Sequence, residues 1–253
     1  MSSTDKNRFE RIEQMIGPGK LQLLAGARVV VAGLGAVGSY AAEGLARAGV
    51  GHFRLVDFDI VRSSNINRQL YALGSTLGRK KCELAAERIC DINPEAVAVP
   101  LELFVHTDTI DEILGSQPDL VIDAIDSFTP KVELLSEVRS RGIPIVSSLG
   151  AALRTDPSMI RVGPLEKVHN DPLGRVVRKK LRQRGIPLDI TCVYSIESPE
   201  EMRDRAITPA DDSEDDYLVR GRRRSTLGSL PTLTGMFGLA AANTAIKMLI
   251  DGF

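Results

Sequence analysis

Short apolar runs alternate with segments of helical composition through the first 150 residues of the chain. The apolar runs that fit buried strands fall at 28–33, 53–58, 96–101, 119–124 and 143–148. Between them lie segments typical of helices, such as 79–92 and 129–140. This alternation predicts an α/β fold with a doubly wound, mainly parallel, Rossmann-like sheet. Right-handed crossovers would place the strand ends near Gly33, Asp57 and Asp126 along one crevice.

The pattern changes after about residue 150. The second half predicts two short strands, a basic helix and a C-terminal helix rich in small residues, at 158–165, 190–198, 171–185 and 232–252. The stretch 198–226 is polar, carries opposed blocks of charge and predicts a mobile loop. The second half is therefore expected to be an appended α+β region.

Composition indicates an ordinary globular protein. The chain has 253 residues, of which 43% are hydrophobic, and its net charge is −1. This balance excludes a uniformly basic nucleic-acid binder but leaves room for a local basic patch. The N-terminus is polar, and the late apolar run 237–250 is short and interrupted by Asn243 and Lys247. We therefore expect a cytoplasmic protein that does not contact a membrane.

The three cysteines are Cys82, Cys90 and Cys192, and no two of them form a CxxC pair. Cys82 and Cys90 would lie roughly 12 Å apart along a helix. We expect neither a zinc site nor a disulfide framework. Cys192 is the only cysteine in the second half. A buried small hydrophobe is its stronger interpretation, and a covalent role as a thiolate is the alternative.

A glycine motif follows the first predicted strand. Gly33, Gly35 and Gly38 have the spacing that lets a backbone turn tightly, approach a phosphate and pack a helix on its strand. Asp57 lies nineteen residues after Gly38, where a Rossmann acid would bind ribose hydroxyls. The motif predicts a nucleotide, and NAD, FAD and ATP all fit it.

Polar residues after Asp57 narrow this choice. Polar and charged residues cluster in the crossover after Asp57, at Asp59, Asn65, Arg68, Gln69 and Lys81. A dehydrogenase would have a crossover without such a cluster. Fixed cations suit a triphosphate attacked at its α-phosphorus, because they stabilise the developing charge and the departing pyrophosphate. Asp123 and Asp126 are oxygen ligands suited to magnesium. Each residue alone also fits a helix cap or a solvated charge, but together they favour a metal–nucleotide site.

The motifs GLGAVGS, DFDIVRSSNINRQ, GRKKCELAAERICDINP and DAIDS resemble the adenylating family that includes ThiF, MoeB and the ubiquitin-activating enzymes. The resemblance covers residues 8–150 and implies that the fold binds Mg-ATP and activates a carboxylate as an acyl-adenylate. The ATP-binding residues that it implies are Gly33, Gly35, Gly38, Asp57, Asp59, Asn65, Arg68, Gln69, Lys81 and Asp126. Of these, Arg68, Lys81 and Asp126 would be catalytic, and Asp126 would also hold magnesium.

The segment RFER at residues 8–11 resembles the N-terminal segment of that family, in which an arginine reaches into the nucleotide site of the neighbouring subunit. Arg11 is the candidate here, with an exposed helix arginine as the alternative. The resemblance thus implies a homodimer. It also implies a single adenylating domain over residues 1–253, with its nucleotide-binding part at about 20–150 and its substrate part at about 151–253.

The second half identifies a branch of the family. Activators of carrier proteins usually hold zinc with two CxxC pairs, which this chain lacks. Instead, EKVHNDPLGRVVRKKLRQRGI and CVYSIESP are similar to the tRNA threonylcarbamoyladenosine dehydratases. These use ATP to activate the carboxylate of that modified adenosine and cyclise it, with release of AMP and pyrophosphate. A sulfurtransferase-type partner protein is left open.

The predicted basic helix carries the candidate tRNA contacts. Arg175, Arg178, Lys179 and Arg182 share one helical face and suit RNA phosphates. A solvated face is the ordinary alternative for such a run. Arginines at 220 and 222–224 are a candidate second contact.

Two other classes of function stay open. An activator of a small ubiquitin-like sulfur carrier would need a partner ending in Gly-Gly. An NAD(P)-dependent oxidoreductase or nucleotide-sensing module would need only the glycine motif.

Overall fold

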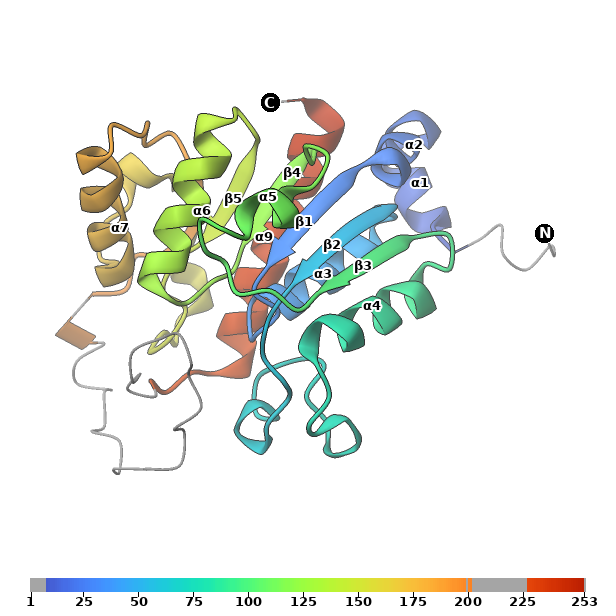
Figure 1. The fold of residues 1–253 in the computed structure, drawn as a ribbon, viewed down its shortest axis with the longest axis horizontal. Helices are drawn as coiled ribbons and strands as arrows, with labels where there is room; N and C mark the ends of the chain where they lie inside the picture. Colours follow the sequence, from blue (N-terminus) through green and yellow to red (C-terminus); the bar gives the residue numbers. More distant parts are fainter. Residues whose placement is uncertain (1–7, 199, 202–226, 253) are drawn as a thin grey trace.

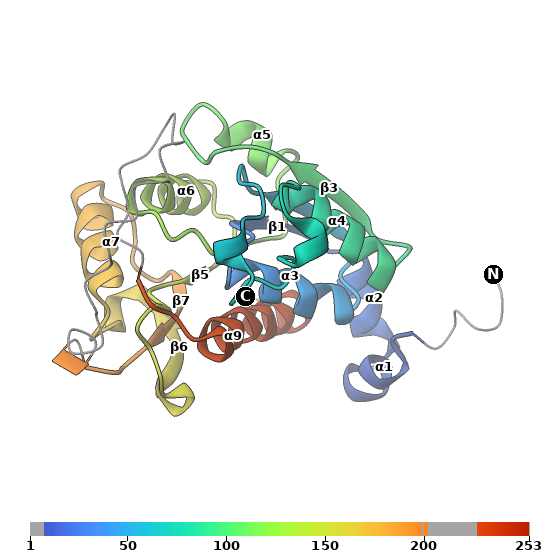
Figure 2. The same cartoon turned by 90° about the horizontal axis from the view of Figure 1, so that it is seen from below.

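The computed structural model describes residues 8–198, 200–201 and 227–252. In this part of the chain seven strands form one sheet, in the order β3-β2-β1-β4-β5-β7-β6. Figure 1 labels β1 to β5, and Figure 2 labels β6 and β7 beside β5. Their bounds are β1 Arg28–Ala32, β2 His52–Val56, β3 Val97–Leu101, β4 Leu120–Asp123, β5 Ile145–Ser148, β6 Ile160–Pro164 and β7 Thr191–Ser195. Only β6 runs antiparallel to its neighbour. The predicted doubly wound, mainly parallel sheet is confirmed.

Helices cover both faces of the sheet (Figure 2). Their bounds are α1 Glu10–Ile16, α2 Pro18–Gly26, α3 Gly38–Arg47, α4 Lys81–Ile92, α5 Ile110–Leu114, α6 Phe128–Ser140, α7 Pro172–Gln183 and α9 Pro231–Asp251. Val29 and Val31 of β1 face the layer of α3, α4 and α9, whereas Val30 and Ala32 face α5, α6 and α7. Because β1 is buried on both faces, its sequence is a continuous apolar run instead of an alternating one.

The winding of the sheet reverses between β1 and β4. The chain proceeds outward from β1 through β2 to β3, then returns to the other side of β1 and continues through β4 to β5. Ala32, the last residue of β1, pairs with Val56 of β2 and Asp123 of β4. The loops after these strands diverge here, and this reversal point is where open α/β sheets bind ligands.

The second half of the chain extends the same sheet. Strand β7 pairs in parallel with β5, β6 follows at the edge, and α7 packs beside α6. Residues 199 and 202–226 lie outside the described residues, and with them the predicted mobile loop and the arginines at 220 and 222–224.

Helix α9 is a core helix of this fold. By length and composition it could cross a membrane, since it has 21 residues and contains an 18-residue window with a mean hydropathy of 1.4. The helix is longer than the apolar run 237–250 suggested. Its small residues instead pack on α3, where a Cβ added at Gly238 would lie 2.3 Å from the carbonyl oxygen of Val37. Close helix packing therefore accounts for the composition of α9.

This contact predicts the effect of adding one methyl group. The change Gly238→Ala should lower the free energy of unfolding by about 1–3 kcal/mol, because the backbone of α3 must move away from the new methyl group. Urea unfolding followed by circular dichroism measures the change. The matched control is Gly19→Ala in α2, which meets nothing within 4 Å and should not destabilise the protein. Equal urea midpoints for the two variants would refute the prediction.

Candidate active site

The turn between β1 and α3 leaves no room for side chains at two of its glycines. Gly33 has a left-handed backbone with φ of 88°, and a Cβ there would lie 2.8 Å from the carbonyl oxygen of Ala124. A Cβ at Gly38 would lie 1.7 Å from the carbonyl oxygen of Gly33. Gly35 differs, because the nearest atom to its added Cβ is Nε2 of Gln69 at 3.7 Å. The turn thus packs tightly at its ends and is open at Gly35, in front of the N-terminus of α3, which favours anions.

Asp57 fixes this turn to the end of β2. The backbone N–H of Leu34 donates to Oδ2 of Asp57 at 2.7 Å, and the N–H of Asp59 donates to Oδ1 at 2.9 Å. Asp57 is buried, and burial raises the pKa of its carboxyl group while Lys81 and the two N–H donors oppose the rise. The predicted ribose acid therefore also shapes the glycine turn.

Lys81 reaches the same corner from the start of α4. Its Nζ lies 3.1 Å from Oδ2 of Asp59, and its side chain is only 6% exposed. The segments 59–61 and 78–81 are tied together by backbone hydrogen bonds such as Lys81 N–H to Asp59 O at 3.0 Å. This holds the ammonium group beside the carboxyl ends of the central strands.

The loop after β2 carries the remaining polar candidates. Asn65 is buried, and its Oδ1 accepts the N–H of Arg62 at 3.1 Å. Gln69 lies against Gly35, and the segment docks on α3 because the N–H of Leu70 donates to Oγ of Ser39 at 3.3 Å. Arg68 is half-buried and donates to Ser64 O and Asn67 Oδ1, both at 2.8 Å. Its guanidinium is thus held within its own loop.

The two aspartates after β4 have different surroundings. Asp126 is exposed on the turn that follows Ala124, the residue in contact with Gly33. Asp123 is fully buried and forms an ion pair with the equally buried Lys131, with 2.5 Å between Oδ2 and Nζ. Asp123 is therefore not available to magnesium, and its proposed role as a ligand was wrong. The apolar context of Asp123 in the strand was the signal for burial.

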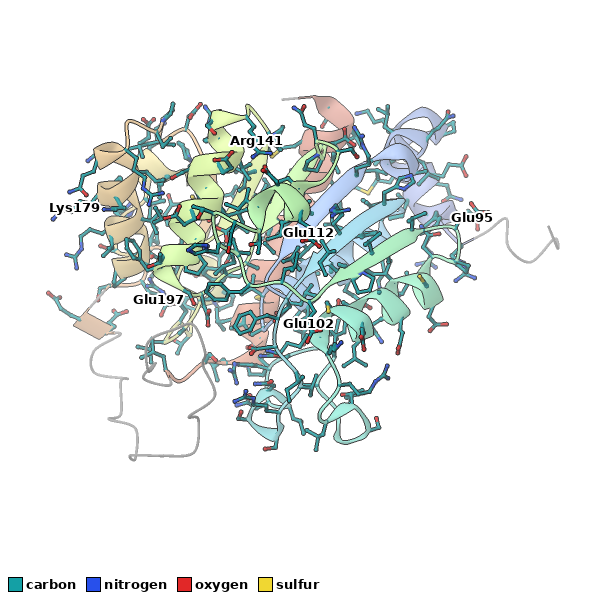
Figure 3. All side chains as sticks on the ribbon, viewed as in Figure 1. Glu95, Glu102, Glu112, Arg141, Lys179 and Glu197 are labelled. Atoms are coloured by element: carbon teal, nitrogen blue, oxygen red, sulfur yellow. The ribbon has the colours of Figure 1, made fainter. Side chains whose placement is uncertain are left out.

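The predicted basic face is only partly exposed. Arg175, Lys179 and Arg182 point away from the core on α7, and Figure 3 shows Lys179 at the outer surface. Arg178 is half-buried and donates to the backbone carbonyls of Leu165 and Val168 at 3.2 and 2.5 Å. Arg178 therefore departs from the predicted stripe, because the segment before α7 offers it two carbonyl acceptors.

Arg11 and Cys192 lie away from the crevice. Arg11 is exposed on α1, a helix with no buried residue. This helix lies at the amino end of the strands, where the neighbouring Arg8 donates to the carbonyls of Asp91 and Ile92 at the end of α4. Cys192 is fully buried on β7, and burial raises the pKa of its thiol. The interpretation of Cys192 as a small buried hydrophobe fits this position.

The charged residues of the core that escaped the sequence analysis include Lys131, Arg154, Asp171 and Glu197. Polar residues follow Arg154 and Glu197 and precede Asp171, which predicts exposure rather than burial. Lys131 is the exception, since it stands between apolar residues of a predicted helix. This apolar context in the sequence was a signal that Lys131 could be buried.

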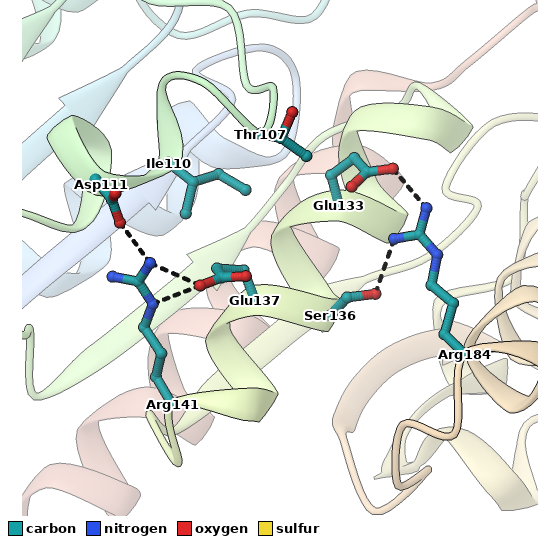
Figure 4. A pocket seen from close by; sticks show the side chains of 8 residues that line it. All are labelled: Thr107, Ile110, Asp111, Glu133, Ser136, Glu137, Arg141 and Arg184. Atoms are coloured by element: carbon teal, nitrogen blue, oxygen red, sulfur yellow. Dashed lines mark hydrogen bonds and ion pairs between the residues drawn. The ribbon is translucent and has the colours of Figure 1, made fainter.

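A surface pocket of about 210 Å³ lies between α5, α6 and α7 (Figure 4). Its charged groups pair with one another: Arg141 with Asp111 and Glu137, and Arg184 with Glu133. The pocket includes the C-terminal end of α6, whereas α6 begins at the crevice. The pocket is therefore separate from the candidate active site.

The fold and the glycine turn define a nucleotide-binding protein of the Rossmann-like class, with cations and carboxylates around the open side of the turn. Residues 9–252 match the ThiF family, and the chain belongs to that family.

Known proteins resemble the chain over most of its length. The tRNA threonylcarbamoyladenosine dehydratase of Bacillus subtilis (strain 168) is 44% identical over 198 residues, which cover 78% of each chain. Two crystal structures of the E. coli dehydratase TcdA, one with ATP and one with AMP, superpose with TM-scores of 0.84. They are 33% and 34% identical to this chain and cover 99% of it, and it covers 96% of each. The match therefore includes the second half of the chain.

The buried pair of Lys131 and Asp123 predicts a large loss of stability on removal of one charge. Lys131→Met should lower the free energy of unfolding by about 3–5 kcal/mol, because it leaves the Asp123 carboxylate buried without a counter-charge. Chemical denaturation measures this. Lys20→Met is the matched control, since Lys20 pairs with Asp251 at the surface, and exposed pairs contribute at most about 1 kcal/mol. A similar small loss in both variants would contradict the prediction.

Proposed function

We propose that this chain is an ATP-dependent tRNA threonylcarbamoyladenosine dehydratase. The observation that carries the proposal is the extent of the similarity to the E. coli dehydratase, which includes the basic helix and the strands after residue 150. An activator of carrier proteins or an NAD(P)-dependent enzyme gives no reason for the second half of the chain to match the dehydratase. The exposed cations of α7 support an RNA substrate.

The proposed reaction has two steps. A carboxylate oxygen of the modified adenosine attacks the α-phosphorus of ATP, and pyrophosphate leaves. The ureido oxygen or nitrogen of the same group then attacks the activated carbonyl and closes a five-membered ring, while AMP leaves with the former carboxylate oxygen and the attacking group loses its proton. Because the second step is intramolecular, positioning and charge stabilisation supply much of its acceleration.

In this proposal the candidate residues bind ATP around the glycine turn. The open backbone at Gly35 and the N-terminus of α3 receive the phosphates. Arg68 and Lys81 stabilise the charge that develops at the α-phosphate and on the leaving pyrophosphate. Asp57 accepts a ribose hydroxyl in addition to its two N–H donors, since each carboxylate oxygen can accept two hydrogen bonds. Asn65, Gln69 and Asp59 complete the polar wall of the site.

Magnesium fits the exposed carboxylate of Asp126. No cluster of three or more candidate metal ligands occurs in the described part of the chain, and magnesium in nucleotide sites takes most of its ligands from phosphates and water. One protein carboxylate beside a triphosphate is therefore sufficient. When bound, the ion neutralises charge on the phosphates.

A homodimer would give Arg11 a role. Within its own subunit Arg11 lies at the amino end of the strands, whereas the crevice lies at their carboxyl end. Helix α1 also has no fully buried residue in its own subunit, where only Ile16 packs against the core. We propose that it packs on a second copy and brings Arg11 to the phosphates there.

The three free cysteines, two of them buried, fit the reducing cytoplasm.

The proposed reaction forms a product that can be weighed. Purified protein incubated with Mg-ATP and tRNA bearing threonylcarbamoyladenosine should convert that nucleoside to a form lighter by one water, with one AMP formed per conversion. Mass spectrometry of the digested tRNA and quantification of AMP measure this. Arg68→Ala and Asp126→Ala should lower the rate at least 100-fold through lost charge stabilisation. Arg161→Ala on the edge strand β6 is the control. An unchanged nucleoside in verified substrate tRNA would overturn the proposal.

Charge reversal on α7 should separate tRNA binding from ATP binding. Lys179→Glu should raise the KM for tRNA about tenfold and reduce the slope of log affinity against log salt by about one, because one phosphate contact is lost. The KM for ATP should not change. The matched control is Lys247→Glu, an exposed lysine on α9. The RNA-binding role of α7 fails if both reversals have the same effect on the KM for tRNA.

A further inference from the structure

Two non-glycine residues in the described part of the chain have a left-handed backbone. They are Leu153 with φ of 61° and Asn170 with φ of 55°. This conformation is rare for leucine and persists only where the surrounding structure enforces it. Each of the two residues directly precedes a buried charged residue, Arg154 and Asp171. The strained positions therefore mark a junction between two segments that are distant in the sequence.

Arg154 joins three segments of the chain. Its guanidinium is fully buried and donates to the carbonyl oxygens of Gly150 at 3.3 Å, Asn170 at 3.0 Å and Glu197 at 2.9 Å. Gly150 follows β5, Asn170 precedes α7, and Glu197 follows β7. A guanidinium has five donors in a fixed plane, so these bonds fix the relative orientation of the three segments.

Glu197 holds the other side of Arg154. Its carboxylate accepts the backbone N–H groups of Thr155 and Asp156, at 3.0 and 3.2 Å to Oε1. The side chain of Arg154 thus binds the backbone of Glu197, and the side chain of Glu197 binds the backbone just after Arg154. Glu197 is labelled in Figure 3. This reciprocal arrangement keeps the strained turn at Leu153 in place.

Asp171 connects the basic helix to the end of β5 directly. Its Oδ1 accepts the N–H of Gly174 at 2.7 Å and so caps α7. Its Oδ2 accepts the N–H of Gly150 at 3.1 Å and lies 3.6 Å from Nη2 of Arg154. One buried carboxylate therefore holds the N-terminus of α7 and the loop after β5 at once.

A second buried group extends this connection to the nucleotide side. Lys131 donates to the carbonyl oxygen of Ser148 at 2.8 Å, two residues before Gly150, and pairs with Asp123. Asp123 accepts the N–H of Ile125 at 3.1 Å in the turn that presents Asp126. Buried polar contacts thus run from the Asp126 turn, through the end of β5, to α7.

We propose that Arg154 and Asp171 are positioning residues, which fix the basic helix α7 to the end of β5 and so set where a bound tRNA presents its carboxylate to the nucleotide. This inference rests on the proposed function. A displaced α7 still carries its exposed cations and still binds RNA phosphates. It would, however, hold the modified adenosine out of line with the α-phosphorus, and small displacements of reacting groups have large effects on rate.

The change Asp171→Asn isolates this role. The asparagine oxygen can still cap α7 at Gly174, but its NH₂ group replaces the oxygen that accepts the N–H of Gly150 and faces Arg154. Arg154→Lys is the second variant, because lysine keeps the charge but cannot span the three carbonyls. The matched control is Asp189→Asn. Asp189 is an exposed aspartate in the loop between α7 and β7, and it pairs with Arg139 of α6.

The measurement is the single-turnover rate of dehydration at saturating tRNA, expressed per ATP-binding site counted by titration, together with the Kd values for tRNA and ATP. We expect the rate per site to fall at least tenfold in both variants, with both Kd values within twofold of the native protein and no effect of Asp189→Asn. A purely structural role would reduce the number of ATP sites and leave the rate per site unchanged.

Four outcomes would reject the positioning role: a native rate per site in both variants, a rate loss explained by weaker tRNA binding, an equal effect of the control, or loss of ATP binding in both variants. Failure of the proposed function is distinct, because the native protein itself would then leave the modified nucleoside unchanged.

Discussion

The absence of two side chains, at Gly33 and Gly38, allows the centre of this protein to close. Any Cβ at Gly38 would collide with the carbonyl oxygen of Gly33, and a Cβ at Gly33 would collide with that of Ala124. Strands β1 and β4 and helix α3 can therefore approach one another only through bare backbone. The carboxylate of Asp57 then ties the turn to β2. The crevice exists because these contacts bring the ends of three strands and a helix N-terminus together.

Charged residues in the core fix the positions of the loops relative to one another. The two hydrophobic clusters on either side of the sheet fill space but do not by themselves fix distances between loops. Buried ion pairs and charge-assisted hydrogen bonds have strict geometry, and leaving one of their members unpaired is costly. Lys131 and Arg154 make such contacts with backbone carbonyls at the carboxyl end of the sheet. The loops that surround the crevice are thereby held to one another as well as to their own strands.

Most of the fold could be predicted from the sequence, because strands buried on both faces leave continuous apolar runs and the glycine spacing marks the first turn. The same local patterns place Lys81 and Asp57 near the crevice. They cannot reveal that Asp123 pairs with Lys131 of α6 while Asp126 stays exposed, since that difference depends on how α6 packs against the strands. Helical spacing likewise placed Arg178 on the exposed stripe. The carbonyls that bind it belong to a preceding segment whose path is decided by tertiary packing.

The contact between α3 and α9 also bears on how the chain folds. Helix α3 belongs to the first crossover, whereas α9 follows every other described element, yet Ala41, Leu45 and Ala242 share one cluster. While the chain is being synthesised, the surface of α3 that packs on α9 has no cover, and such a transiently exposed apolar surface favours aggregation. Pairing between such distant segments also slows folding. The hydrophobic cluster around α3 is therefore complete only once α9 has been synthesised.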